Sequence, residues 1–157
     1  MILDSDTICD KALIAILWNT GHRISEVLNL TRDDIWYDDK WLFFRLSVGK
    51  RRTEFIHTIK IPRRAMFVDY IIDYVSTIDT GLLFDFTRQY VDLKLKKLNP
   101  NASAHKFRHS LATRLAEKGA NRYQLDAFFG WSSKGNTSGI YVSKGTALIE
   151  GVANMID

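Results

Sequence analysis

Cysteine is almost absent from this sequence, and no long hydrophobic run interrupts it. Cys9 is the only cysteine in the chain, which excludes an intrachain disulfide and a cysteine-based zinc finger. No apolar run approaches the roughly 20 residues that span a bilayer. The N-terminus, MILDSDTICDK, is acidic where a secretion signal is basic. We therefore expect a cytoplasmic, intracellular protein with no membrane partner.

Linkers, low-complexity tracts and internal repeats are missing as well, and there are only two prolines. A chain of 157 residues is long enough for one domain with a sizeable core and short for two. Hydrophobic residues make up 46% of the chain and charged residues 25%, which is the mix of an ordinary globular domain. We predict one domain over residues 1–157.

The charge that is present is moderately basic, with a net value of +4 and an isoelectric point of about 9.2. Basic clusters lie at residues 50–52, 63–64 and 94–97, separated by aromatic and apolar segments. Neutralising the phosphates of a nucleic acid requires such clusters on one face. From charge alone a nucleic-acid partner and an ordinary solvated basic surface both remain open.

Apolar residues at helical spacing predict that helices form most of the chain. The expected caps are Ser25, Ser103 and Asn121, and the expected stop signals are Gly21, Gly119 and Gly130. Pro62 is expected to begin a helix. The predicted helices cover residues 10–20, 25–30, 62–75, 89–98, 104–118, 122–129 and 146–156.

Two segments rich in aromatic and β-branched residues, WLFFRLSV at 41–48 and EFIHTIKI at 54–61, flank the basic stretch GKRRT. This pattern predicts a β-hairpin with a basic turn. The predicted fold class is α+β, mainly α-helical with a small antiparallel β-hairpin or sheet.

A polar cluster begins the predicted helix AHKFRHSLATRL at residues 104–115. His105, Arg108 and His109 are three and four residues apart and share one helix face. A zinc site is one interpretation, but no glutamate lies between the histidines and no cysteine is near. A solvated polar stripe is the second. The third is an anion site, where the helix N-terminus and Arg108 converge on a phosphate.

A second polar group lies in TGHRISEVLNLTRDDI at residues 20–35. Arg23 falls in the turn between two predicted helices, and Glu26 is placed three residues on, where its carboxylate can orient the guanidinium. The alternative is a plain helix corner with a surface ion pair, which contributes little stability.

Taken in order, these segments resemble a known family over nearly the whole chain. TGHRISEVLNL, the hairpin, HKFRHSLATRLAEKGA and FFGWSSKGNTSGIY are similar to the catalytic domain of the tyrosine recombinases, the phage-integrase family. The resemblance implies the tyrosine recombinase catalytic-domain fold. The site residues that it implies are Arg23, Lys50, His105, Arg108, Trp131 and Tyr141.

The resemblance also implies a role for each of these residues. Arg23 and Arg108 hold the nonbridging oxygens of a phosphate, because a guanidinium presents a planar fork to them. Tyr141 is the nucleophile, and Lys50 is the acid for the leaving oxygen. His105 acts as acid or base, and Trp131, where many members have histidine, donates its indole N–H. No metal and no cofactor are expected. Lys60 and Tyr123 are the fallback lysine and tyrosine.

The function implied is site-specific cleavage and rejoining of double-stranded DNA through a 3′-phosphotyrosine, as in a viral or mobile-element integrase. The resemblance further implies self-association as a tetramer on DNA, weak or absent without it. The N-terminal DNA-clamping domain of full-length members is expected to be absent. A type IB topoisomerase and a DNA-binding protein that has lost catalysis are the alternatives. Residues 146–156 are expected either to dock on a neighbouring protomer or to pack on their own core.

Overall fold

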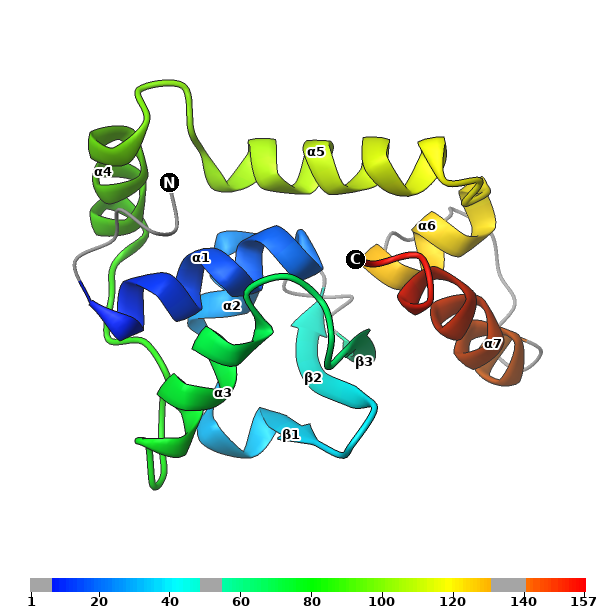
Figure 1. Ribbon diagram of the computed structural model, residues 1–157, viewed down its shortest axis with the longest axis horizontal. Coiled ribbons are helices and arrows are strands. Elements are labelled where there is room, and N and C mark those ends of the chain that lie inside the picture. Colours follow the sequence, from blue (N-terminus) through cyan, green and yellow to red (C-terminus); the bar gives the residue numbers. More distant parts are fainter. Residues whose placement is uncertain (1–6, 49–54, 131–140) are drawn as a thin grey trace.

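The computed structural model describes residues 7–48, 55–130 and 141–157, with only the backbone for residues 48, 55 and 141–146. Helices dominate these residues and a small antiparallel sheet accompanies them (Figure 1). This confirms the predicted α+β class. The helices are α1 (Ile8–Thr20), α2 (Ile24–Leu28), α3 (Val68–Ser76), α4 (Arg88–Leu98), α5 (Ala104–Glu117), α6 (Arg122–Phe129) and α7 (Tyr141–Ala153). The strands are β1 (Ile35–Tyr37), β2 (Trp41–Val48) and β3 (Phe55–Pro62).

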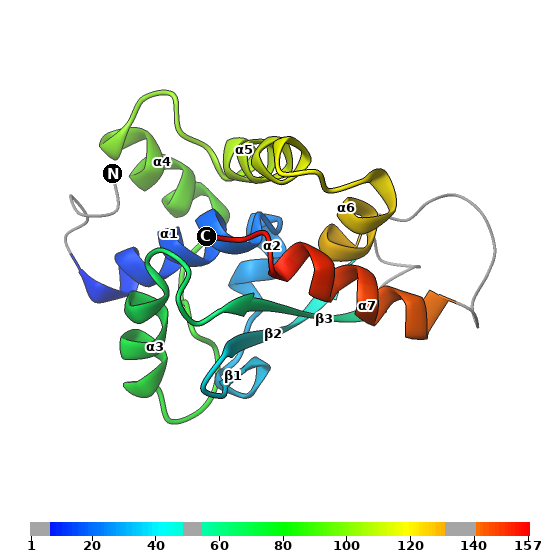
Figure 2. The same cartoon turned by 45° about the vertical axis from the view of Figure 1, so that its right-hand side comes forward.

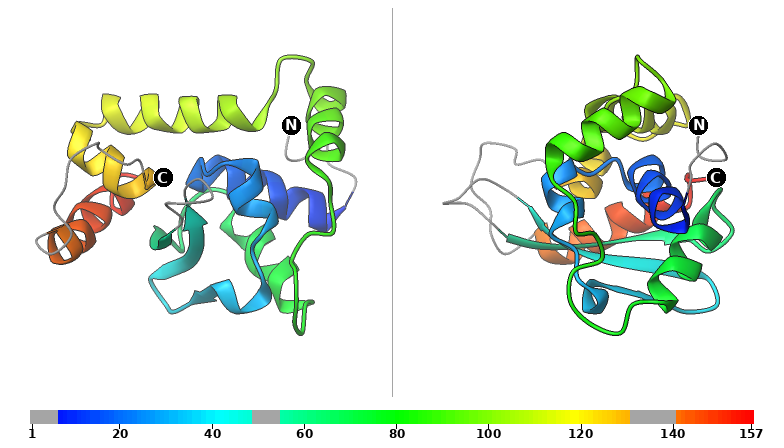
Figure 3. Two further views of the ribbon diagram at one scale, coloured as in Figure 1. Left: turned by 180° about the vertical axis from the view of Figure 1, so that it is seen from behind. Right: turned by 90° about the vertical axis from the view of Figure 1, so that its left-hand side faces the viewer.

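Helix α1 lies at the centre of the molecule, between α5 on one side and the sheet with α3 on the other (Figures 1 and 3). Every residue from Ala12 to Leu17 is at most 3% exposed. A helix that is apolar and buried on all sides belongs to the core rather than to the surface. The other elements are therefore arranged around α1.

The sheet has the strand order β1-β2-β3, and all its pairings are antiparallel. Leu42 lies opposite Ile61 and Phe44 opposite Ile59, so alternate residues of both strands face the core and are at most 1% exposed. Helix α7 runs beside β3 and packs against it and against α6 (Figure 2).

Two polar contacts attach the outer helices to α1. Lys94 of α4 forms an ion pair with Asp10, whose side chain is 2% exposed. Arg114 of α5 lies 4.1 Å from the centre of the Trp18 ring and donates a hydrogen bond of 3.2 Å to the Trp18 carbonyl. Because Asp10 and Trp18 both belong to α1, these contacts define the positions of α4 and α5 relative to α1.

The end of α1 is held against α5 by a glycine. Gly21 adopts a left-handed conformation with φ of 58° and donates its N–H to the Leu17 carbonyl, which ends the helix as predicted. A Cβ atom at this position would lie 2.8 Å from Cε1 of Phe129 and 3.2 Å from the backbone Cα of Arg108. Only glycine allows this approach.

Three predictions about which helices and strands occur and where they begin were wrong. Pro62 is the last residue of β3 rather than the start of a helix, because β3 is an edge strand, where a residue without an N–H is tolerated. Helix α3 begins six residues later, at Val68. The three-residue strand β1 was not predicted, and α7 begins at Tyr141 instead of residue 146. Ser103, Asn121 and Gly130 cap or end their helices as expected.

The C-terminal segment packs on its own core. Val152, Ala153 and Ile156 are at most 4% exposed. Lys118 donates a hydrogen bond of 2.8 Å to the Met155 carbonyl and pairs with the Asp157 side chain. Of the two arrangements expected for this segment, the structure shows packing within the chain. No helix in the described ranges is long and apolar enough to cross a membrane.

Two histidines stack in the core between β3, α6 and the start of α2. His22 is fully buried, and its Nδ1 donates a hydrogen bond of 2.9 Å to the Thr20 carbonyl. Its ring lies 5.9 Å from the ring of His57, centroid to centroid. His57 in turn donates from Nε2 to the Phe128 carbonyl at 2.9 Å. The pair therefore connects β3 to the last turn of α6.

We predict that Gly21→Ala lowers the free energy of unfolding by about 2–4 kcal/mol, from left-handed backbone strain and the clash with Phe129 together. Gly81→Ala is the matched control, since Gly81 has φ of 86° but no atom lies within 4 Å of the place that a Cβ would take there. Gly81→Ala should lower the free energy of unfolding by the backbone strain alone, about 1–2 kcal/mol. Equal losses in urea unfolding for both variants would show that the close approach contributes nothing.

We also predict that stability falls on acidification. Burial, and then the neighbouring His57, Arg108 and Arg23, hold the pKa of His22 well below its ordinary 6.5, while the Thr20 carbonyl opposes this. Burial also lowers the pKa of His57. The unfolded chain therefore binds protons more readily, so stability is complete above pH 6.5 and declines as pH falls below it.

The decline should approach about 1.4 kcal/mol per pH unit for each histidine. Urea unfolding of the wild type and of His22→Asn between pH 8 and pH 5 measures this decline. The variant should show a shallower slope, and superimposable slopes would contradict the assignment to His22.

Candidate active site

A cleft of about 920 Å³ lies among the first residues of α2, α4 and α5. Its walls combine segments that are distant in the sequence. From α2 and the turn before it come His22, Arg23, Ile24 and Ser25. From α4 come Arg88, Gln89, Val91, Asp92 and Leu95, and from the start of α5 come Ser103, Ala104, His105 and Arg108.

Arg23 stands at the N-terminal cap of α2, with its side chain 54% exposed. The Glu26 carboxylate accepts a hydrogen bond from the Arg23 backbone N–H at 2.9 Å and another from its Nη1 at 3.0 Å. The sequence prediction that Glu26 orients this guanidinium is confirmed. The prediction of Ser25 as the cap was wrong, because Glu26 reaches back to the N–H of Arg23 and helix formation begins at Ile24.

Arg108 is buried, with 7% of its surface exposed. Its Nη1 donates a hydrogen bond of 3.2 Å to the Gly21 carbonyl, and its guanidinium carbon lies 5.0 Å from the centre of the Phe129 ring. The position of the guanidinium is therefore set by the end of α1 and by α6 together.

The two arginines are close enough to affect each other. Burial, and then the charge of Arg23, lower the pKa of Arg108 to about 10, while the Glu26 carboxylate opposes this shift. Arg108 still carries its positive charge at neutral pH. Two like charges facing one cleft repel each other, and this repulsion destabilises the folded chain. An anion bound between them removes the repulsion. The arrangement is suited to binding an anion.

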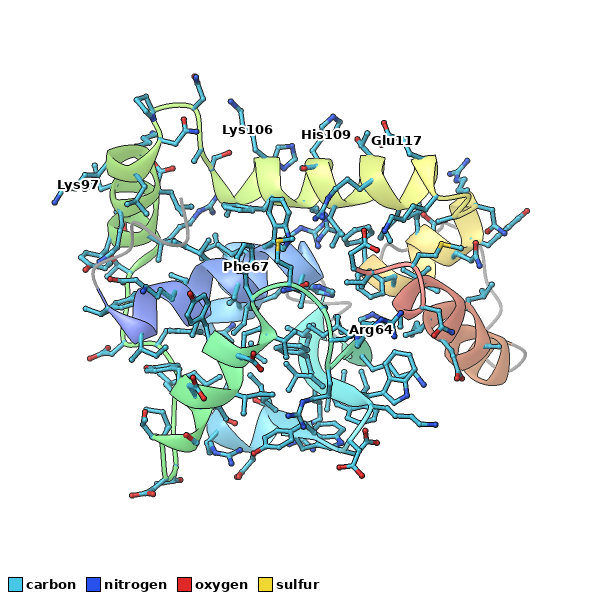
Figure 4. The ribbon with its side chains drawn as sticks, viewed as in Figure 1. Arg64, Phe67, Lys97, Lys106, His109 and Glu117 are labelled. Carbon is cyan, nitrogen blue, oxygen red and sulfur yellow. The ribbon has the colours of Figure 1, made fainter. Side chains whose placement is uncertain are left out.

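His105 is exposed on the first turn of α5 and lines the same cleft. The turn is held by Ser103, whose hydroxyl accepts a hydrogen bond of 3.3 Å from the Lys106 N–H. His109 is also exposed, and Figure 4 shows it pointing away from the body of the molecule together with Lys106. In the described part of the chain no group of three potential metal ligands comes together, so the zinc interpretation of His105 and His109 gains no support.

The structure thus brings three of the six predicted site residues together: Arg23, His105 and Arg108. Lys50 and Trp131 lie outside the described residues. Tyr141 is the first residue of α7, and its side chain is not among those described. The assignments of Lys50, Trp131 and Tyr141 therefore stay predictions.

Lys60 and Tyr123, the fallback lysine and tyrosine, lie away from the cleft. Lys60 lies 4.4 Å from the centre of the Trp41 ring and pairs with Glu150 of α7 at 3.5 Å. Tyr123 is 68% exposed on α6. Neither lines the cleft.

Sequence analysis missed the contribution of α4. Arg88 and Gln89 line the cleft from its first turn, and nothing in the motifs points to them. The available signal was the threonine cap at Thr87, whose hydroxyl accepts from the Tyr90 N–H at 3.1 Å. A capped helix that begins with arginine is a candidate anion contact wherever the fold turns it toward a cleft.

Solved structures with the same fold include a site-specific recombinase and a phage integrase. The XerH site-specific recombinase bound to its palindromic difH substrate, in a post-cleavage complex, superposes with a TM-score of 0.70 at 19% identity, over 98% of this chain and 48% of that one. The integrase from mycobacterium phage Brujita gives a TM-score of 0.61 at 14% identity, over 99% of this chain and 60% of that one. At these identities the likeness shows the fold alone.

Curated relatives are similar over most of the chain. Tyrosine recombinase XerA of Pyrococcus furiosus is 27% identical over 151 residues, which cover 87% of this chain and 51% of the relative. Tyrosine recombinase XerD of Staphylococcus epidermidis is 24% identical over 148 residues, which cover 82% of this chain and 48% of the relative. This chain spans about half the length of the curated relatives that it matches.

The family assignment comes from a match that extends over nearly the whole sequence. It agrees with the order of the motifs and with the common cleft of Arg23, His105 and Arg108. Because the model of the phage integrase family matches residues 2–147, this chain belongs to the phage integrase family.

Proposed function

We propose that this chain cleaves and rejoins DNA strands at specific sites through a 3′-phosphotyrosine intermediate, and that residues 1–157 form the catalytic domain. The observation that carries the proposal is the meeting of Arg23, His105 and Arg108 at one cleft, from opposite parts of the sequence. Two guanidinium groups facing one space suit a phosphate, which accepts their planar forks.

The arginines are held in place before any substrate binds. Glu26 holds Arg23, and the Gly21 carbonyl holds Arg108. Charge on the nonbridging oxygens grows as phosphorus becomes five-coordinate, and donors that are already oriented stabilise this charge without reorganisation. His105 acts as an acid or a base toward the reacting groups, and Trp131 donates a further hydrogen bond to these oxygens through its indole N–H.

In the cleavage step the phenol of Tyr141 loses its proton, normally held with a pKa of about 10, and its oxygen attacks phosphorus. The bond from phosphorus to the 5′-oxygen breaks as the tyrosyl bond forms, and Lys50 gives a proton to the leaving oxygen. The product keeps a phosphodiester bond, so attack by another 5′-hydroxyl reverses the step and reseals the strand.

Double-stranded DNA is the proposed partner, supported by the XerH site-specific recombinase of the same fold, which has been solved with its difH substrate before and after cleavage. We propose assembly as a tetramer on DNA and weak association without it. The packing of α7 on its own core supports the second part, because Val152 and Ile156 are already covered within the chain. Nothing in the described residues favours a type IB topoisomerase or a binder without catalysis.

The decisive test of the nucleophile is Tyr141→Phe, which removes one oxygen and little volume. Wild type should form an SDS-resistant adduct with a pool of nicked duplexes of randomised sequence, and the variant should form none while binding DNA equally well. Tyr123→Phe is the matched control, since Tyr123 lies on the exposed surface of α6, and its adducts should match the wild type. Adducts of Tyr141→Phe would disprove the mechanism.

A second test addresses Arg108, for which lysine keeps the charge and removes the fork. We predict that Arg108→Lys slows adduct formation on the order of 100-fold or more, since oriented transition-state donors contribute that much. Arg114→Lys is the control, because Arg114 also lies on α5 and stacks on an aromatic ring, that of Trp18. Similar rates for both variants would remove Arg108 from the site.

A further inference from the structure

His57 does not line the cleft, yet it contacts two segments that lead to the arginines there. It lies on the core-facing side of β3 with 9% of its surface exposed, and its Nε2 donates a hydrogen bond of 2.9 Å to the Phe128 carbonyl. This carbonyl lies in the last turn of α6, where the helix has no N–H of its own to offer. A residue 71 positions away in the sequence therefore supplies the donor that holds the end of α6.

The contact with α6 leads to Arg108. Phe129 follows Phe128 directly, and their rings meet edge to face with centroids 5.2 Å apart. The Phe129 ring lies 5.0 Å from the guanidinium carbon of Arg108. Both phenylalanines are fully buried, and close-packed side chains transmit a displacement to their neighbours. A shift of the last turn of α6 therefore moves the ring against which Arg108 is placed.

A second contact of His57 leads to Arg23. The His57 ring stacks on the ring of His22, with centroids 5.9 Å apart and 29° between the planes. His22 is fully buried and immediately precedes Arg23. Burial lowers the pKa of His57, while its backbone hydrogen bond and then the charge of Glu26 oppose this. The same Glu26 carboxylate holds the Arg23 guanidinium, so His57 adjoins both the turn and the carboxylate that place this arginine.

We propose that His57 is a positioning residue of the active site. Its hydrogen bond to α6 and its stacking on the turn before α2 hold the two arginines at a fixed separation. This inference rests on the proposed function, because the separation matters for the reaction only if both guanidinium groups bind one phosphate. His57 acts through the ring of Phe129 and the turn that carries His22, without contact with the DNA.

Glutamine and asparagine at position 57 separate the reach of the side chain from its polarity. The amide nitrogen of His57→Gln stands about where Nε2 stands and can donate to the Phe128 carbonyl, whereas that of His57→Asn is one methylene short. The first measurement is the Arg108 Nε–Hε resonance in the NMR spectrum of the free protein, which carries the ring-current shift of Phe129. His57→Asn should lose part of this shift, and His57→Gln should keep it.

The second measurement is the rate of adduct formation with nicked duplexes at saturating DNA. His57→Asn should slow it on the order of 10- to 100-fold, because a displacement of about 1 Å reaches the upper value. DNA affinity should stay unchanged, and His57→Gln should restore most of the rate. Ile61→Val is the matched control, since Ile61 is a buried residue on the same face of β3 and the change leaves only a small cavity. It should match the wild type in both measurements.

The proposal is overturned if His57→Asn keeps the wild-type resonance or rate, if His57→Gln is as impaired as His57→Asn, or if Ile61→Val is impaired equally. If His57→Asn does not fold, His57→Leu takes its place, because leucine removes the donor without burying an unpaired amide. The resonance requires neither DNA nor cleavage. A wild type that forms no adduct would therefore disprove the proposed function, while the resonance still tests whether His57 places Arg108.

Discussion

The contact between Gly21 and Arg108 is the constraint on which the site depends. A helix that ends in a left-handed glycine brings its carbonyl within 3.2 Å of the Arg108 guanidinium and its Cα against the backbone of α5. The next residues along the chain are His22 and Arg23. The same close approach therefore ends α1, seats α5 and places the two arginines on one cleft.

The cleft carries an electrostatic cost that its neighbours only partly offset. Arg108 is buried beside Arg23, and both effects lower its pKa, while the Glu26 carboxylate stabilises the pair from one side. Such a site is most stable with an anion bound, because the anion relieves the repulsion that the fold imposes. Stability and the proposed phosphate binding are thus coupled through the same two side chains.

The errors in the sequence predictions have particular physical causes. Pro62 is compatible with a helix start, but the pairing of Trp41 with Pro62 continues β3 to that residue. Ser25 is a good capping residue, but the carboxylate of Glu26 satisfies the N–H of Arg23 two residues earlier than expected. In both cases a contact specific to this fold outweighed a general residue preference.

The resemblance to the phage-integrase family gave Arg23, His105 and Arg108 as one set. Residue types and spacing alone determined the mainly helical class and the ends of α1 and α6 at Gly21 and Gly130. These features are local, since they depend on periodicity, capping and glycine backbone freedom. Only the tertiary structure decided that Arg108 is buried against Phe129, that His22 stacks on His57, and that Arg88 shares the cleft. Each of these pairs joins segments far apart in the chain, and no local pattern encodes such a distance.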